Sequence, residues 1–147
     1  MKSRIATDEM IAAANPPEGY RPIVSNSNFA WENGPLFEKR VDDIWSRGFR
    51  VAERHINAGG MCHGGMLMTF ADIMLATAVM EVTDPPFVTV RLTTDFLGPA
   101  KLGDWVEGAA TAHSAGDGLF SVAGSIWVGD KLVADASALF KAFQRKS

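Results

Sequence analysis

The fifteen residues from Met66 to Met80 constrain the fold more than any other segment of this chain. They carry one charged side chain, Asp72, and only two other polar residues, Thr69 and Thr77. At about 1.5 Å per residue, such a helix is too short for the roughly 30 Å hydrocarbon core of a membrane, where a central Asp would also be costly. A helix that is apolar all round and does not span a membrane is buried in protein, so we predict a core helix.

After Asp84-Pro-Pro86 the apolar residues recur with a period of two, which is typical of half-buried strands. Small side chains at seven strand positions would let a sheet curve closely around a bulky element: Ala109, Ala110, Ala112, Ala134, Ala136, Ala138 and Ala142. We therefore expect an α+β fold in which a long antiparallel sheet wraps the central helix. The predicted strands span 37–41, 49–55, 88–95, 104–114, 119–128 and 132–143, and the first two are joined around residues 42–43.

The first third of the chain is irregular. Thr7 is placed to cap a short helix that ends at Ala14, before Pro16-Pro17, and residues 15–35 contain four prolines. We expect residues 1–35 to form an N-terminal arm and residues 36–147 to form one domain. A single sheet of this size cannot cover the helix on every side, so we expect at least a homodimer.

Composition excludes several classes of function. The 147 residues fit one domain, and a net charge of −3 without a basic cluster argues against nucleic-acid binding. The single cysteine, Cys62, cannot form an internal disulfide, which fits a reducing compartment. Residues 1–10 lack the apolar core of a signal peptide, so we expect a cytoplasmic protein with no membrane partner.

The glycine-rich connection before the helix, residues 57–65, is the first candidate site. Gly64 and Gly65 open the helix, so their backbone N–H groups have no intrahelical acceptor and lie at its positive end. Such donors can bind an oxyanion or a polarised carbonyl. Asn57 can donate an amide hydrogen bond to an acyl group, and His63 lies in the same loop. The alternative is a glycine turn that only packs the helix against the sheet.

Asp72 is the second candidate, because burying an unpaired carboxylate is costly. It is either a core Asp that bonds to Ser, Thr or backbone, or a general base or nucleophile that faces a cleft. Gly65 and Asp72 are seven residues apart and share a helix face, but lie about 10 Å apart along the axis. Asp72 is therefore too far from a carbonyl held at its own helix start. A symmetric dimer would bring the Asp72 of one chain to Gly64 of the other.

Other chemistries fit poorly. Cys62 and His63 are neighbours in sequence, which does not align a thiol with an imidazole, so we expect Cys62 to pack in the interior. His55, His63 and His113 lack metal-ligand spacing, so we expect no metal site. The chain has no Gly-x-Ser-x-Gly elbow, phosphate-binding Gly-Lys-Ser/Thr loop or dinucleotide fingerprint.

The pattern Asn57-x-x-Gly60-x-x-His63-Gly64-Gly65, with Asp72 seven positions further on, resembles the PaaI-like acyl-CoA thioesterases of the hotdog superfamily. The likeness extends from about Phe37 to Phe143. It implies a hotdog fold, dimers that often pair into tetramers, and active sites at the dimer interface. It implies no cofactor, since coenzyme A is part of the substrate.

The resemblance also implies roles for individual residues. Asn57 would orient the substrate or the attacking water, and the Gly64 N–H would polarise the thioester carbonyl. His63 would help to position the thioester. Asp72 of the other subunit would attack the carbonyl or activate water, and Thr89 would position that water or Asp72.

Substrate contacts are expected at Gly65, where a ligand can approach the backbone closely, and at Met68. Met68 is one of several flexible methionines that suit a varied acyl chain. The alternative is that these methionines only pack in the core. Coenzyme A carries several negative charges and needs local basic side chains. The candidates are Arg91 and Lys101, with Lys141, Arg145 and Lys146 as further possibilities.

We therefore expect a thioesterase that hydrolyses an acyl-CoA or aryl-CoA. One alternative is a hotdog enoyl-CoA hydratase. Its usual Asp and His on the helix are not visible here, because Asp72 lies within the helix and His63 precedes it. The other alternative is a non-catalytic acyl-CoA-binding domain.

Overall fold

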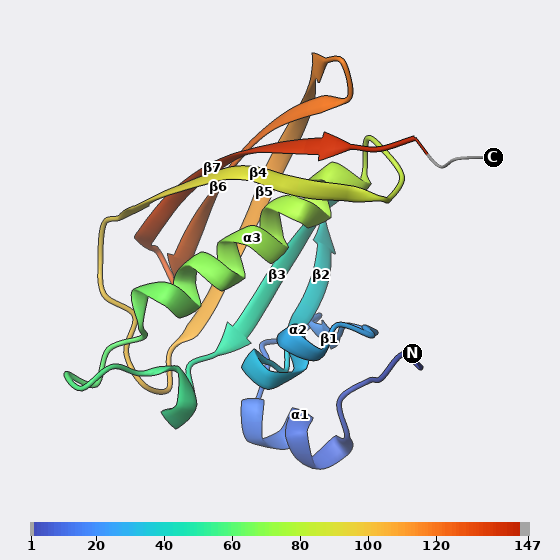
Figure 1. Cartoon of the computed structure of the whole chain (residues 1–147). Coiled ribbons are helices and arrows are strands. Elements are labelled where there is room, and N and C mark those ends of the chain that lie inside the picture. The colour runs from blue at the N-terminus through green and yellow to red at the C-terminus, as the bar shows by residue number, and fades with distance from the viewer. Residues whose placement is uncertain (1, 145–147) are drawn as a thin grey trace.

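The computed structural model describes residues 2–144 and has the expected α+β architecture. A curved antiparallel sheet wraps one face of the long helix α3, Gly64–Met80 (Figure 1). Across the sheet the strand order is β1-β2-β3-β5-β6-β7-β4. Within residues 2–144, no helix has the length and hydropathy needed to cross a bilayer. The strands are β1 (Arg21–Pro22), β2 (Phe37–Val41), β3 (Ile44–Arg50), β4 (Phe87–Phe96), β5 (Trp105–Gly116), β6 (Leu119–Val128) and β7 (Lys131–Ala142).

The sheet-facing side of α3 forms the core. Phe70, Leu75 and Val79 of the helix are completely buried there. The helix approaches β5 closely because position 108 is glycine: a Cβ at Gly108 would lie 2.5 Å from the sulfur of Met74. The predicted core helix is therefore confirmed on the side that the sheet covers.

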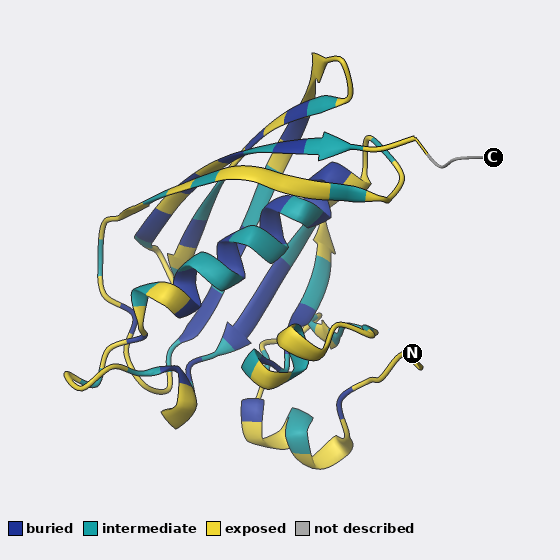
Figure 2. Ribbon diagram, in the orientation of Figure 1, coloured by how far each residue is buried: buried dark blue, intermediate teal, exposed yellow. Residues whose placement is uncertain are grey.

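The opposite flank of α3 is left largely open by residues 2–144. Asp72 and Ile73 are only half-buried, and β4 beside them is an edge strand that is largely exposed (Figure 2). On β4, 49% of Val88 and 55% of Val90 are exposed. The strand was expected to be half-buried. In a single chain it is more exposed than that, because β7 is the one strand that pairs with it in the described part of the chain.

The prediction of a strand over residues 49–55 is wrong. Asp42 and Asp43 both adopt positive φ, which closes a two-residue hairpin and starts β3 at Ile44. The strand ends at Arg50 because its partner β5 begins opposite it, at Trp105. The chain then makes a 3₁₀ turn over Glu53–His55. The other predicted strands are confirmed to within two residues at each end.

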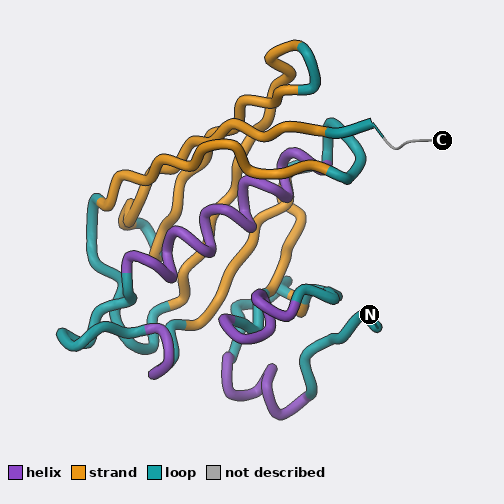
Figure 3. Tube along the Cα trace, viewed as in Figure 1, coloured by secondary structure: helices purple, strands orange, loops and turns teal. Residues whose placement is uncertain are grey.

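The N-terminal segment contains α1 (Asp8–Ala14) and α2 (Asn28–Asn33), which lie beyond the β2 edge of the sheet (Figure 3). The predicted cap is present, since the Thr7 side chain accepts a hydrogen bond from the Met10 N–H at 3.2 Å. β1 pairs with β2, and the Tyr20 hydroxyl donates to Glu107 of β5 at 2.6 Å. These contacts hold the arm against the sheet.

Candidate functional site

The start of α3 presents one free backbone donor. His63 caps the helix, and its Nδ1 accepts the Gly65 N–H at 2.8 Å. The expectation that both glycine amides are available is therefore wrong for Gly65, because a side chain of the same loop already satisfies it. The Gly64 N–H has no hydrogen-bond partner among residues 2–144. It lies at the positive end of α3, where a developing oxyanion would be stabilised.

The loop before α3 is shaped by Asn57. Its Oδ1 accepts the N–H groups of Gly59, at 2.9 Å, and Met61, at 3.2 Å. This use of the oxygen leaves the Nδ2 amide as a donor at the surface. Loop and helix start are tied to the body of the protein by the N–H of His63, which donates to the carbonyl of His55 at 2.8 Å.

His55 and Cys62 support this loop from the interior. The Nδ1 of His55 accepts the Ala52 N–H at 2.9 Å, and its Nε2 lies 2.8 Å from the Asn33 carbonyl. Burial lowers the pKa of His55, so the ring stays neutral. Burial also raises the pKa of Cys62 to about 11, which keeps the thiol protonated. Cys62 is therefore an interior packing residue, as expected.

Asp72 faces outward from the uncovered flank of α3. Thr89 of β4 donates its hydroxyl to the Asp72 Oδ1 at 2.6 Å, so a predicted pair of site residues is in contact. The Oδ2 has no hydrogen-bond partner within residues 2–144. Asp72 also lines a cleft of about 760 Å³, so the carboxylate is not sealed inside its own subunit.

The cleft continues along α3 beneath the N-terminal arm, and a polar cluster that the sequence did not indicate closes one part of it. The Nε of buried Arg47 donates to Thr77 at 2.9 Å, and its Nη1 pairs with Glu38 at 2.8 Å. Arg21 pairs with the other oxygen of Glu38 at 3.2 Å. Burial lowers the pKa of Arg47 while the charge of Glu38 opposes that shift, and a guanidinium stays protonated at neutral pH.

This cluster could be suspected from the sequence only at single positions. Arg47 is a charged residue between two predicted strands, and Thr77 is a polar residue in an apolar helix. Their contact depends on the β2–β3 register, which pairs Glu38 with Arg47, and on how α3 docks onto the sheet.

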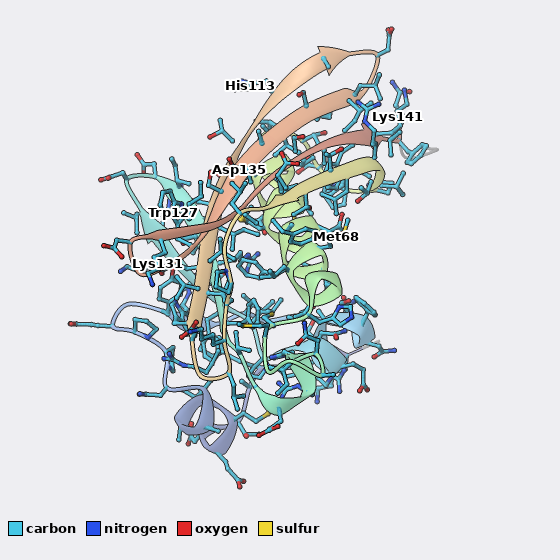
Figure 4. The ribbon with its side chains drawn as sticks, turned by 90° about the vertical axis from the view of Figure 1, so that its left-hand side faces the viewer. Met68, His113, Trp127, Lys131, Asp135 and Lys141 are labelled. Carbon is cyan, nitrogen blue, oxygen red and sulfur yellow. The ribbon has the colours of Figure 1, made fainter. Side chains whose placement is uncertain are left out.

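The remaining predicted residues are distributed unevenly. Lys101 adjoins the glycine loop, because it forms an isolated β-bridge with Met61. Met68 lies on α3, half-buried (Figure 4), and Arg91 is exposed on β4. Lys141 is far from the loop: it donates to the Asp117 carbonyl in the β5–β6 hairpin, at the opposite end of the molecule (Figure 1). The candidates Arg145 and Lys146 lie outside the described residues.

One distance limits what a single chain can do. Gly64 and Asp72 are eight residues apart on one helix, or about 12 Å along its axis. A carbonyl bound to Gly64 is out of reach of Asp72 in the same chain.

The described residues also offer no site for a metal ion. Among residues 2–144, no three His, Cys, Asp or Glu side chains form a group that could hold one.

Comparison with known proteins identifies a matching family and similar proteins. A family model of the thioesterase superfamily matches residues 59–134, which include Gly64, Asp72 and Thr89. A Pseudomonas aeruginosa protein provisionally named an esterase is 36% identical over 129 residues, which cover 86% of this chain and 96% of that protein.

Two solved structures show the same fold. The Escherichia coli PaaI protein, from the phenylacetic acid degradation operon, has a TM-score of 0.71 and 23% identity, covering 81% of this chain and 86% of its own. A Streptococcus mutans protein bound to acetyl-CoA has a TM-score of 0.62 and 21% identity, covering 71% and 84%. The expected hotdog fold is therefore confirmed. From the family match and the 36% identity along most of its length, the chain belongs to the thioesterase superfamily.

Proposed function

We propose that this protein hydrolyses acyl-CoA or aryl-CoA thioesters at sites shared between two copies of the chain. The observation that carries the proposal is the Asp72 carboxylate, held by Thr89 at 2.6 Å on the accessible flank of an otherwise apolar helix. A buried structural Asp would have both oxygens satisfied by neutral partners. Here one oxygen is oriented by Thr89 and the other is available to a water or a substrate.

In the proposed reaction the thioester carbonyl accepts the Gly64 N–H of one subunit. Asp72 of the second subunit removes a proton from a water molecule as that water adds to the carbonyl carbon. The oxyanion that forms is stabilised by the Gly64 N–H and by the positive end of α3. The intermediate then expels the coenzyme A thiolate as the C–S bond breaks, and the thiolate takes up a proton. In the second version Asp72 adds to the carbonyl carbon itself, and the coenzyme A thiolate leaves as the C–S bond breaks and takes up a proton. Water then hydrolyses the resulting mixed anhydride to the free acid and regenerates the Asp72 carboxylate.

The neighbouring side chains suit positioning roles. Thr89 fixes Oδ1 of Asp72 and so directs Oδ2 toward the water. The Asn57 amide can donate to the substrate or the water, because its oxygen is engaged within the loop. His63 accepts from Gly65 through Nδ1, which leaves Nε2 as the ring nitrogen that can donate to the thioester.

Dimer formation is supported by the uncovered surface. β4 is an edge strand, and an exposed apolar edge favours pairing with another chain. Besides Val88 and Val90, Phe96 and Leu97 at the end of β4 are 51% and 54% exposed. A two-fold axis at this edge would pair each β4 with its copy and bring the α3 helices together. The exposed β4 edge accounts for a dimer, and it gives no reason for two dimers to assemble into a tetramer.

Coenzyme A as the thiol is supported by the related fold that binds acetyl-CoA. Lys101 lies beside the glycine loop and is our candidate for its phosphates, with Arg91 on β4 as the second. A hydratase is less favoured, because α3 contains no histidine. A binding domain would need no oriented carboxylate.

The test measures thiol release from a panel of acyl-CoA and aryl-CoA substrates. Asp72→Asn should lower kcat by about 10²–10⁴-fold, because a general base is lost, while circular dichroism shows a folded protein. Thr89→Val should give a smaller loss of kcat. Asp130→Asn, an exposed carboxylate on the β6–β7 turn, is the matched control and should leave kcat unchanged.

Full turnover by folded Asp72→Asn would refute the assignment. Hydration of crotonyl-CoA without thiol release would support the hydratase instead. Tight acyl-CoA binding with neither reaction would support the binding domain.

A further inference from the structure

The cleft beside Asp72 extends along α3 toward the end of the helix. Asp72, Ala76 and Met80 line one wall at successive turns, over about 12 Å. The opposite wall comes from the N-terminal arm, where the apolar side chains of Ile5 and Ile23 alternate with polar ones such as Ser25. The cleft, called the channel below, starts at the proposed catalytic carboxylate.

Arg47 faces this channel with its charge only partly neutralised. The side chain is buried, and two of its three nitrogens contact Thr77 and Glu38. Nη2 has no hydrogen-bond partner among residues 2–144. In that range the Thr94 hydroxyl is the one side-chain polar atom that is both buried and unpartnered, so Nη2 must be in contact with solvent. Arg47 lines the cleft, so Nη2 is available to a ligand there.

The cluster as a whole is cationic. Arg47 and Arg21 share one carboxylate, Glu38, which leaves one net positive charge at this end of the channel. An acyl chain with an uncharged end would leave the Arg47 donor without a new partner. A carboxylate would accept a charge-assisted hydrogen bond from it, which is the stronger interaction.

The spacing between the two ends sets the length of the ligand. Thr77, which Arg47 contacts, is five residues beyond Asp72, or about 7.5 Å along the helix. An extended covalent chain advances about 1.2 Å per bond, so a chain of about six bonds spans this rise along the helix axis. In a six-carbon dicarboxylic acid, six bonds separate the thioester carbonyl carbon from the distal carboxylate oxygens.

We propose that this channel binds the acyl group and that Arg47 selects substrates whose acyl group ends in a carboxylate about six bonds from the thioester. The inference rests on the proposed function, because it places the scissile carbonyl beside Asp72. The methylene carbons pack between α3 and the arm, and Arg47 binds the distal carboxylate through Nη2. Arg47 is a specificity residue that does not touch the reacting atoms.

The experiment compares adipyl-CoA with hexanoyl-CoA, which have the same carbon number and differ in the terminal carboxylate. We expect kcat/KM to be about tenfold or more higher for adipyl-CoA. Arg47→Gln should remove that preference, because KM should rise more for adipyl-CoA than for hexanoyl-CoA. Arg40→Gln, a β2 arginine that does not line the cleft, is the matched control and should keep the preference.

Glu38→Gln provides an opposite and independent readout. It removes the negative charge of the cluster while its amide oxygen can still accept from Arg47, so the preference for adipyl-CoA should rise at least about twofold. If circular dichroism shows that Arg47→Gln does not fold, the sign of the Glu38→Gln effect decides the question.

Equal kcat/KM for the two substrates, or a higher value for hexanoyl-CoA, would overturn the inference while leaving thioester hydrolysis intact. If neither thioester is hydrolysed, the wider substrate panel decides the proposed function separately. Calorimetry with the two thioesters then tests the channel, which requires tighter binding of adipyl-CoA and loss of that difference in Arg47→Gln.

Discussion

Replacing Gly64 by proline removes the one free backbone donor of the proposed site and little else. Gly64 is the first residue of α3, where proline fits the helix because this N–H has no intrahelical acceptor. The preceding residue must then be extended, and His63 already has φ −61° and ψ 137°. Gly64→Pro should therefore fold normally, with equal or slightly higher stability because the unfolded chain loses freedom.

The expected loss of activity follows from the number of donors. Because His63 occupies the Gly65 N–H, the Gly64 N–H is the one helix-terminal amide here that can stabilise the oxyanion. Removing one oxyanion-hole donor lowers kcat by about 10²–10³-fold, or about 2.7–4 kcal/mol of transition-state stabilisation. Gly64→Ala is the matched control, because it keeps the N–H and its Cβ would lie 3.5 Å from the Phe96 ring, an ordinary contact.

Thiol-release kinetics and thermal unfolding of the two variants provide the assay. Wild-type kcat in a folded Gly64→Pro protein would refute the role of the amide. The same variant also tests the shared site: coexpression with Asp72→Asn should restore roughly a quarter of wild-type activity, since half the dimers are hybrids with one complete site each. No recovery in verified hybrid dimers would mean that both residues act from one chain.

Two further predictions concern stability. Burial depresses the pKa of His55 below the ordinary histidine value of about 6.5, so the unfolded chain binds more protons than the folded one below pH 6.5. The free energy of unfolding should therefore fall as the pH drops below 6.5. In urea titrations at several pH values, His55→Gln should flatten that slope. In Gly108→Ala the new Cβ would lie 2.5 Å from the Met74 sulfur and 2.6 Å from the Ser125 carbonyl oxygen. This overpacking should lower the free energy of unfolding, measured by chemical denaturation, by about 1–3 kcal/mol. Unchanged stability would mean that α3 can move away from β5 without cost.

A continuous apolar run was sufficient to predict α3, and period-two alternation was sufficient for the four long strands that follow it. In those strands one face is apolar and turn residues mark the ends, as at Gly129, whose φ of 59° closes the last hairpin. The alternation failed at β3, where Ser46, Arg47 and Gly48 interrupt the apolar pattern. There the hairpin geometry and the pairing with β5 set the ends of the strand, and both depend on tertiary structure.

The candidate site was predictable to the extent that it is local. Gly64, His63 and Asp72 belong to one loop and helix, so their order along the chain fixes their order in space. The resemblance to a known family also implied that Thr89 acts with Asp72, and the two side chains are in contact. The capture of the Gly65 N–H by His63 depends on one side-chain rotamer, which the residue order does not specify.

The proposed hydrolytic residues and the proposed substrate cleft come from different parts of the chain. The thioesterase family match spans residues 59–134 and contains Gly64, Asp72 and Thr89, whereas Glu38, Arg47 and the arm lie before it. The arm and β2–β3 contact α3 through side chains such as Arg47 on Thr77, and not through the donors and carboxylate of the proposed reaction. Substitutions there can change the length and charge of the channel without moving Asp72 or Gly64. Selectivity for the acyl group can therefore vary between relatives that keep the same hydrolytic residues.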